Sequence, residues 1–88
     1  MTAKEMFEQL GYERRLIHSD TKKVLATMYV KEYDKNDEVI ICLANNSKTY
    51  RVENVEGRKN HENIYATSVD IETHQAITQQ MKELGWIE

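Results

Sequence analysis

One thiol, three imidazoles and several carboxylates are the side chains of this sequence that could carry out chemistry. Cys42 lies in the longest apolar run, whereas reactive cysteines lie in exposed, electropositive sites. His74 follows Asp70 and Glu72 at a spacing that suggests a metal site, but a helix would place only Asp70 on its face. No further pair has metal-ligand spacing, and three glycines leave no glycine-rich phosphate loop. We therefore predict no catalytic residue, no metal site and no cofactor.

A set of polar and aromatic residues at alternate positions is the feature most suited to binding. We predict that they share the outer face of a sheet, and they are Thr27, Tyr29, Lys31 and Tyr33 in one strand and Thr49 and Arg51 in another. Tyrosine and arginine are enriched in protein interfaces. The same basic and aromatic pattern could instead stack single-stranded nucleic acid, or it could belong to a solvated face that only supports the sheet.

Two short amphipathic helices are predicted to flank this sheet. The first covers residues 3–10, with Thr2 and Glu5 as a capping box and Gly11 as its end. The second begins after Asp70 as N-cap and ends at Gly85. In both, a Schellman motif would bring one apolar pair together, and these pairs are Phe7 with Tyr12 and Met81 with Trp86.

The residues between the helices alternate with the period of β-strands. We predict an edge strand at 12–18 and further strands at 23–33, 38–44 and 48–55, with turns between them and an exposed loop at 56–63. Residues 64–69 could be a short strand or an extended lead-in to the last helix. Two sets are expected to face the helices: Val24, Ala26, Met28 and Val30 in one strand, and Tyr50 and Val52 in another.

These elements predict one α+β domain over residues 1–88. Its expected form is a two-layer sandwich, an antiparallel β-meander of four to five strands with the N- and C-terminal helices packed on one face. The 40% hydrophobic and 31% charged residues are typical of a globular protein. No apolar run could cross a bilayer and no signal core is visible, so we expect a cytoplasmic protein without a membrane.

The net charge of −3 is unevenly distributed along the chain. Residues 14–59 hold ten bases and seven acids, whereas both ends are acidic. A dedicated nucleic-acid binder has a stronger basic footprint than this. Nucleic acid is therefore ranked below protein as a partner.

The two ends of the chain resemble small uncharacterised proteins of Gram-positive phages and integrative mobile elements. The residues that carry this resemblance are Thr2-Ala3-Lys4-Glu5-Met6-Phe7-Glu8-Gln9-Leu10-Gly11-Tyr12 and Ala76-Ile77-Thr78-Gln79-Gln80-Met81-Lys82-Glu83-Leu84-Gly85-Trp86-Ile87. Asp70 stands where such proteins would have threonine, and either residue caps a helix. The resemblance implies a bacterial cytoplasmic setting and an accessory role for a mobile element. It assigns no functional residue.

We expect a non-enzymatic protein-interaction module, with a second copy of the chain as one partner. A modulator of host machinery that acts through an acidic surface is the second expectation. Single-stranded nucleic-acid binding by the outer sheet face is the third.

Overall fold

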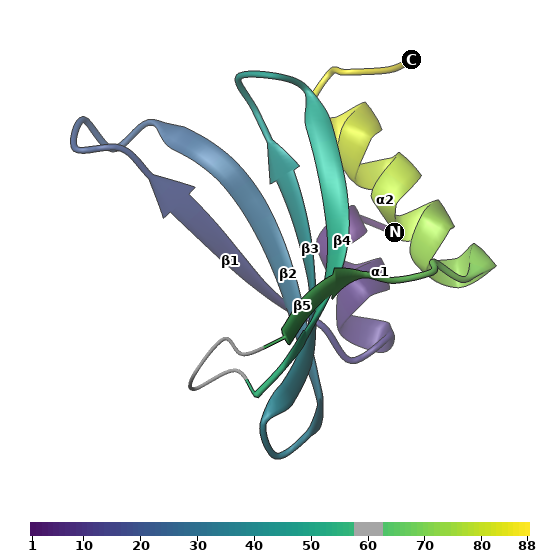
Figure 1. Cartoon of the computed structure of the whole chain (residues 1–88). Coiled ribbons are helices and arrows are strands. Elements are labelled where there is room, and N and C mark those ends of the chain that lie inside the picture. Colours follow the sequence, from purple (N-terminus) through teal and green to yellow (C-terminus); the bar gives the residue numbers. More distant parts are fainter. Residues whose placement is uncertain (58–62) are drawn as a thin grey trace.

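The structure, a computed structural model, describes residues 1–57 and 63–88 (Figure 1). Its elements are α1 (Ala3–Gln9), β1 (Glu13–His18), β2 (Val24–Asp34), β3 (Asp37–Ala44), β4 (Thr49–Glu56), β5 (Asn63–Ala66) and α2 (Ile71–Glu83). The strands form one antiparallel sheet in the order β1-β2-β3-β4-β5. The predicted α+β meander is confirmed. Most of the predicted loop at 56–63 lies outside the described residues.

Both helices begin and end as their sequences predict. In α1 the amide of Glu5 donates to Thr2 Oγ1 at 3.1 Å, and the amide of Thr2 donates to Glu5 Oε1 at 3.0 Å. The helix ends in a Schellman motif, in which the Tyr12 amide donates to the Phe7 carbonyl at 2.9 Å. Gly11 adopts the φ of +93° that this motif requires. The same motif ends α2.

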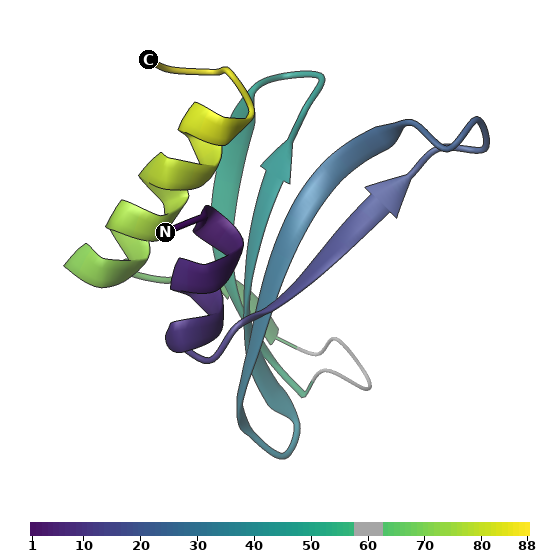
Figure 2. The same cartoon turned by 180° about the vertical axis from the view of Figure 1, so that it is seen from behind.

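The two helices lie side by side on one face of the sheet, as the views from both sides show (Figures 1 and 2). A direct link joins them, because the Ala3 amide donates to Glu83 Oε2 at 2.7 Å. The core lies between this helical layer and the sheet. Its fully buried members are Phe7, Tyr29, Ile41, Leu43, Ala76 and Ile77.

The strand register shows which residues face the helices. Tyr29 is in register with Ile41, and Ile41 is in register with Val52, so these three share the helix-covered face. Likewise Tyr50 is in register with Leu43 on that face, which confirms the predicted facing of Tyr50 and Val52. The facing predicted for Ala26, Met28 and Val30 of β2 is wrong.

Residues at alternate positions of β2, Ala26, Met28 and Val30, lie on the face without helices. Both faces of this strand carry apolar surface, so alternation alone could not choose between them. The ring of Tyr29 is the largest such surface in the strand, and the helices cover that side.

The last strand covers only part of the segment 64–69 that was predicted as a strand or a lead-in. β5 ends at Ala66, and residues 67–70 form a lead-in without strand structure to α2. Within the described ranges, neither helix has the length and apolar character that a bilayer crossing requires.

Candidate functional site

The six residues predicted to form one outer surface are divided between the two faces of the sheet. Thr27 and Tyr29 are 3% and 0% exposed beneath the helices, so their predicted outward facing is wrong. Lys31 is half-buried on the same face, with its ammonium 5.7 Å from the centre of the Tyr12 ring. Thr49 and Arg51 lie on the opposite face. The predicted surface is therefore not assembled.

Tyr33 is exposed, as predicted, but its hydroxyl is engaged. It donates to Asn54 Oδ1 at 2.6 Å. With Tyr29 buried and the Tyr33 hydroxyl bonded to Asn54 of β4, the described residues form no row of exposed aromatic rings along β2 on which bases could stack.

Tyr29 joins the sheet to both helices. Its ring stacks on that of Phe7 with centroids 3.8 Å apart, and its hydroxyl donates to Gln80 Oε1 of α2. Burial raises the pKa of Tyr29, while the nearby charge of Arg14 acts in the opposite direction. A buried tyrosine requires a polar partner for its hydroxyl, and Gln80, only 5% exposed, supplies it.

Sequence reasoning missed Gln80, although a signal was present. Gln80 follows Thr73, Ala76 and Ile77 at helical spacing, so a polar amide continues the buried stripe of α2. A glutamine on a buried stripe indicates a buried polar partner elsewhere in the fold. It does not say which residue that partner is.

The helix-free face of the sheet carries an apolar stripe along its two central strands. Its members pair across the strands as Ala26 with Ala44, Met28 with Cys42, and Val30 with Ile40. They alternate with Tyr29 and Ile41, which pack under the helices, so they lie on the opposite face of the sheet. Ala26 and Val30 are buried, and the other four are half-buried. We call these six residues the apolar stripe.

Charged residues lie on both sides of the apolar stripe. On β1, Glu13 is in register with Val30 and Arg15 with Met28; on β4, Glu53 is in register with Ile40 and Arg51 with Cys42. Each side forms its own ion pair: Arg15 Nη2 lies 3.6 Å from Glu13 Oε2, and Arg51 contacts Glu53. We call these four residues the charged flanks.

Two exposed isoleucines extend the apolar surface beyond the flanks. Ile17 is in register with Ala26 and is 41% exposed, and Ile64 is in register with Val55 and is 52% exposed. The helix-free face thus combines exposed and half-buried apolar side chains with the balanced charged flanks, and Glu32 and Glu38, one row beyond Val30 and Ile40, add acidic charge to it. Such a face is suited to contact with another apolar surface.

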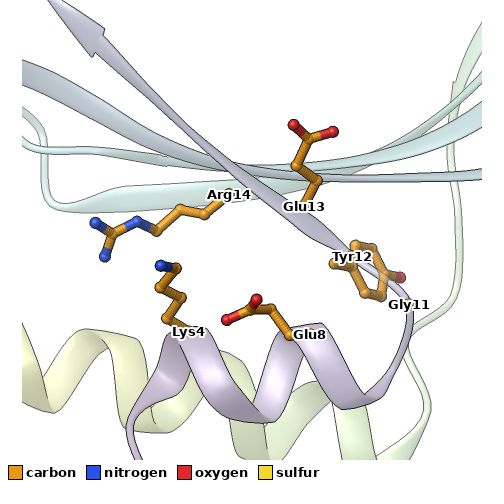
Figure 3. Close-up of a pocket in the computed structure, with 6 residues that line it drawn as sticks. All are labelled: Lys4, Glu8, Gly11, Tyr12, Glu13 and Arg14. Atoms are coloured by element: carbon orange, nitrogen blue, oxygen red, sulfur yellow. The ribbon is translucent and has the colours of Figure 1, made fainter.

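A separate hollow of about 580 Å³ opens between α1 and β1 (Figure 3). Lys4 and Glu8 of α1 and Arg14 of β1 extend into the same space from its two sides. With Glu13 also in the lining, two cations stand beside two carboxylates, so the hollow has no net charge that would favour an anionic group. The described residues that line the hollow include no cysteine, serine or histidine.

The other candidates for chemistry remain apart. Cys42 is a half-buried free thiol within the apolar stripe, and His18 and His74 are exposed. His61 lies outside the described residues. Among residues 1–57 and 63–88, no three His, Cys, Asp or Glu side chains gather closely enough to hold a metal ion.

Comparison of the chain with protein families, with curated proteins and with solved structures finds no match. What the molecule does must therefore be argued from its own surfaces, and the helix-free face is the strongest of them.

Proposed function

We propose that this chain is a non-enzymatic protein-interaction module that associates with a second copy of itself through the helix-free face. The observation that carries the proposal is the apolar stripe, which occupies the centre of a sheet face that neither helix covers. Burial of apolar surface drives most protein association. The helices cover one face of this sheet and leave apolar side chains on the other. A partner that buried those side chains would be bound by the hydrophobic effect.

The charge of this face favours a second copy over a polyanion. The charged flanks hold two acids and two bases, so they contribute no net charge. Glu32 and Glu38 continue the same face one row beyond Val30 and Ile40 and make it acidic as a whole, so it would repel a polyanion. A second copy presents an equal apolar area and the same balance of charges, as the interfaces of two-fold dimers do.

The experiment measures oligomeric state by light scattering and sedimentation over a wide concentration range. The wild-type chain is expected to dimerise reversibly. Met28→Glu places a carboxylate in the middle of the apolar stripe, and dimerisation should weaken by about a hundredfold or more, since the charge would be buried unpaired.

Ile71→Glu is the matched control. Ile71 is 76% exposed at the start of α2, on the other side of the molecule, so the same chemical change there should leave dimerisation unaltered. A wild-type chain that stays monomeric at every concentration contradicts the proposal. Equal effects of the two substitutions would contradict the choice of face.

A second candidate function rests on the hairpin formed by β1 and β2. Residues 14–25, which we call the basic arm, hold Arg14, Arg15, Lys22 and Lys23 against one acid, Asp20, in a chain of net charge −3. Arg14 lies beside α1, and from there the arm extends away from the helices (Figure 1). Two-stranded ribbons fit the major groove of DNA, and lysine and arginine contact phosphates. We propose phosphate-backbone binding by this arm as the alternative to self-association.

Fluorescence anisotropy with a duplex oligonucleotide tests this alternative across a salt series. Four phosphate contacts predict a log–log salt slope of about −3.6, and Lys22→Glu with Lys23→Glu should make it shallower by about 1.8. Lys82→Glu on α2 is the control. Absence of binding at low salt would exclude the basic arm as a nucleic-acid site.

A further inference from the structure

We propose that the charged flanks determine how two copies pair: the sheets meet face to face about a two-fold axis that runs across the strands. This inference rests on the proposed function, because it specifies the orientation of the same association. It follows from the order of charges on the helix-free face.

Two neighbouring rows of residues cross the face from β1 to β4. The first row reads Glu13, Val30, Ile40 and Glu53, and the second reads Arg15, Met28, Cys42 and Arg51. Both ends of the first row are therefore acidic, and both ends of the second are basic. The apolar stripe lies between them in each row.

A two-fold axis that runs across the strands, between these rows, exchanges one row for the other. Glu13 then faces Arg15 of the second copy, and Glu53 faces Arg51 of the second copy. Symmetry repeats both contacts, so four pairs of opposite charge surround the buried stripe. Each strand lies over its own counterpart in the antiparallel sense, an orientation close to that of aligned sheet packing.

The other face-to-face arrangement has its axis along the strands. It would place β1 over β4 of the second copy, so that Glu13 would face Glu53 and Arg15 would face Arg51. All four contacts would then join like charges, which is unfavourable at an interface. The order of charges therefore selects the axis across the strands.

The apolar stripe does not make this choice. With either axis the stripe of the second copy covers its four central members, Met28, Val30, Ile40 and Cys42. With the axis across the strands, Ala26 and Ala44 face Glu32 and Glu38 of the second copy. Apolar burial thus provides affinity in both arrangements, and the charged flanks provide orientation. Exposure of the Arg15 and Arg51 side chains, 52% and 73%, leaves both free to reach a second copy.

The experiment uses two single-signed variants, in which all four residues of the charged flanks carry the same sign of charge. The acidic variant carries R15E and R51E, and the basic variant carries E13R and E53R. A dimer of either variant would contain four contacts between like charges. Its dissociation constant should therefore be at least about a hundredfold higher than that of wild type. Mixed in equal amounts, they should form a heterodimer of near wild-type affinity, which also shows that both are folded.

An exchange within one flank tests the axis itself. The variant with E13R and R15E keeps opposite charges in contact when the axis crosses the strands, so its dimerisation should match wild type. With the axis along the strands, the same exchange would replace four like-charged contacts by opposite ones and would tighten the dimer by about tenfold or more.

The outcomes distinguish this inference from the function on which it rests. If wild type and both single-signed variants dimerise equally while Met28→Glu does not, the face is the interface but the charged flanks do not orient it. If the exchange within β1 tightens the dimer, the axis runs along the strands. A monomeric wild type would overturn the proposed function as well.

Discussion

Tyr29 and Met28 are neighbours in one strand, yet they belong to two different surfaces. Tyr29 is 0% exposed, with Phe7 stacked on its ring and Gln80 accepting from its hydroxyl. Met28 is half-buried on the face that neither helix covers. The two helices of the same chain cover one face of the sheet. No helix covers the other face. One face therefore stabilises the fold, and the other is available for association.

This difference shows that apolar content alone does not mark the interior of a two-layer fold. All six side chains of the apolar stripe are apolar, but none is aromatic. The aromatic stack of Phe7 on Tyr29 offers more contact area, and the Tyr29 hydroxyl has a partner on α2. The helices cover the face on which both kinds of contact are available.

The largest expected effect is the loss of the aromatic stack. Phe7→Ala should reduce the free energy of unfolding by about 3–5 kcal/mol, because a fully buried ring is replaced by a cavity above Tyr29. Urea denaturation followed by circular dichroism measures it. Ile71→Ala, at an exposed helical position, is the control and should have little effect. A loss of similar size in both variants would contradict the assigned core.

The polar contact within the same core has the next largest effect. Tyr29→Phe keeps the ring but leaves the buried Gln80 amide without its donor, which should cost about 1–3 kcal/mol. Combining it with Gln80→Met removes both polar groups, so the double variant should lose less than the sum of the two single variants. Additive losses would show that the hydroxyl and the amide do not interact.

Acid should lower the stability of the fold through the carboxylates that cap the two helices. Hydrogen bonds from the Thr73 backbone and side chain lower the pKa of Asp70, and those from Thr2 lower the pKa of Glu5. A carboxyl with a lowered folded-state pKa contributes stability that is present above its unfolded pKa and is lost as pH falls through the folded value. Urea midpoints should therefore decline below about pH 4.

Amide variants identify the source of this decline. Asp70→Asn and Glu5→Gln remove the two titrating groups, and asparagine is itself a favoured N-cap, so the start of α2 stays capped. The double variant should therefore have a flatter acid limb than wild type. An unchanged acid limb would place its origin outside the helix N-termini.

The smallest expected effect belongs to the helix-free face. Arg51→Ala removes an ion pair from an exposed side chain, and the monomer should lose no more than about 0.5 kcal/mol. Measurement at concentrations where wild type is monomeric isolates this effect from association. A loss comparable to that of Tyr29→Phe would mean that the charged flanks stabilise the fold itself, and the contrast between the two faces would disappear.

Local signals in the sequence were sufficient for the helix ends and the turns. Thr2, Glu5 and Gly11 interact with residues a few positions away, so their geometry follows from short-range hydrogen bonding and backbone preference. The antiparallel order of the strands follows similarly from short connections. These parts were predicted correctly.

The candidate surface was predicted incorrectly because it depends on distant residues. Thr27 and Tyr29 were assigned to the solvent on the basis of alternation, but their environment is set by α1 and by α2, which is about fifty positions away in the chain. The Gln80 amide on a buried stripe was the one local sign of a buried donor. Thr49 and Arg51 were correctly placed outward, since the first half of β4 has one apolar face only.

Residue types and short spacings by themselves determined where each helix begins and ends, where the chain turns and which segments form strands, because these features depend on neighbours within a few positions. Only the tertiary structure decided which face of the sheet the helices cover. A central strand with apolar groups on both sides can be buried from either side, and the choice depends on the combined packing of Phe7, Tyr29 and Gln80, which come from three separate elements.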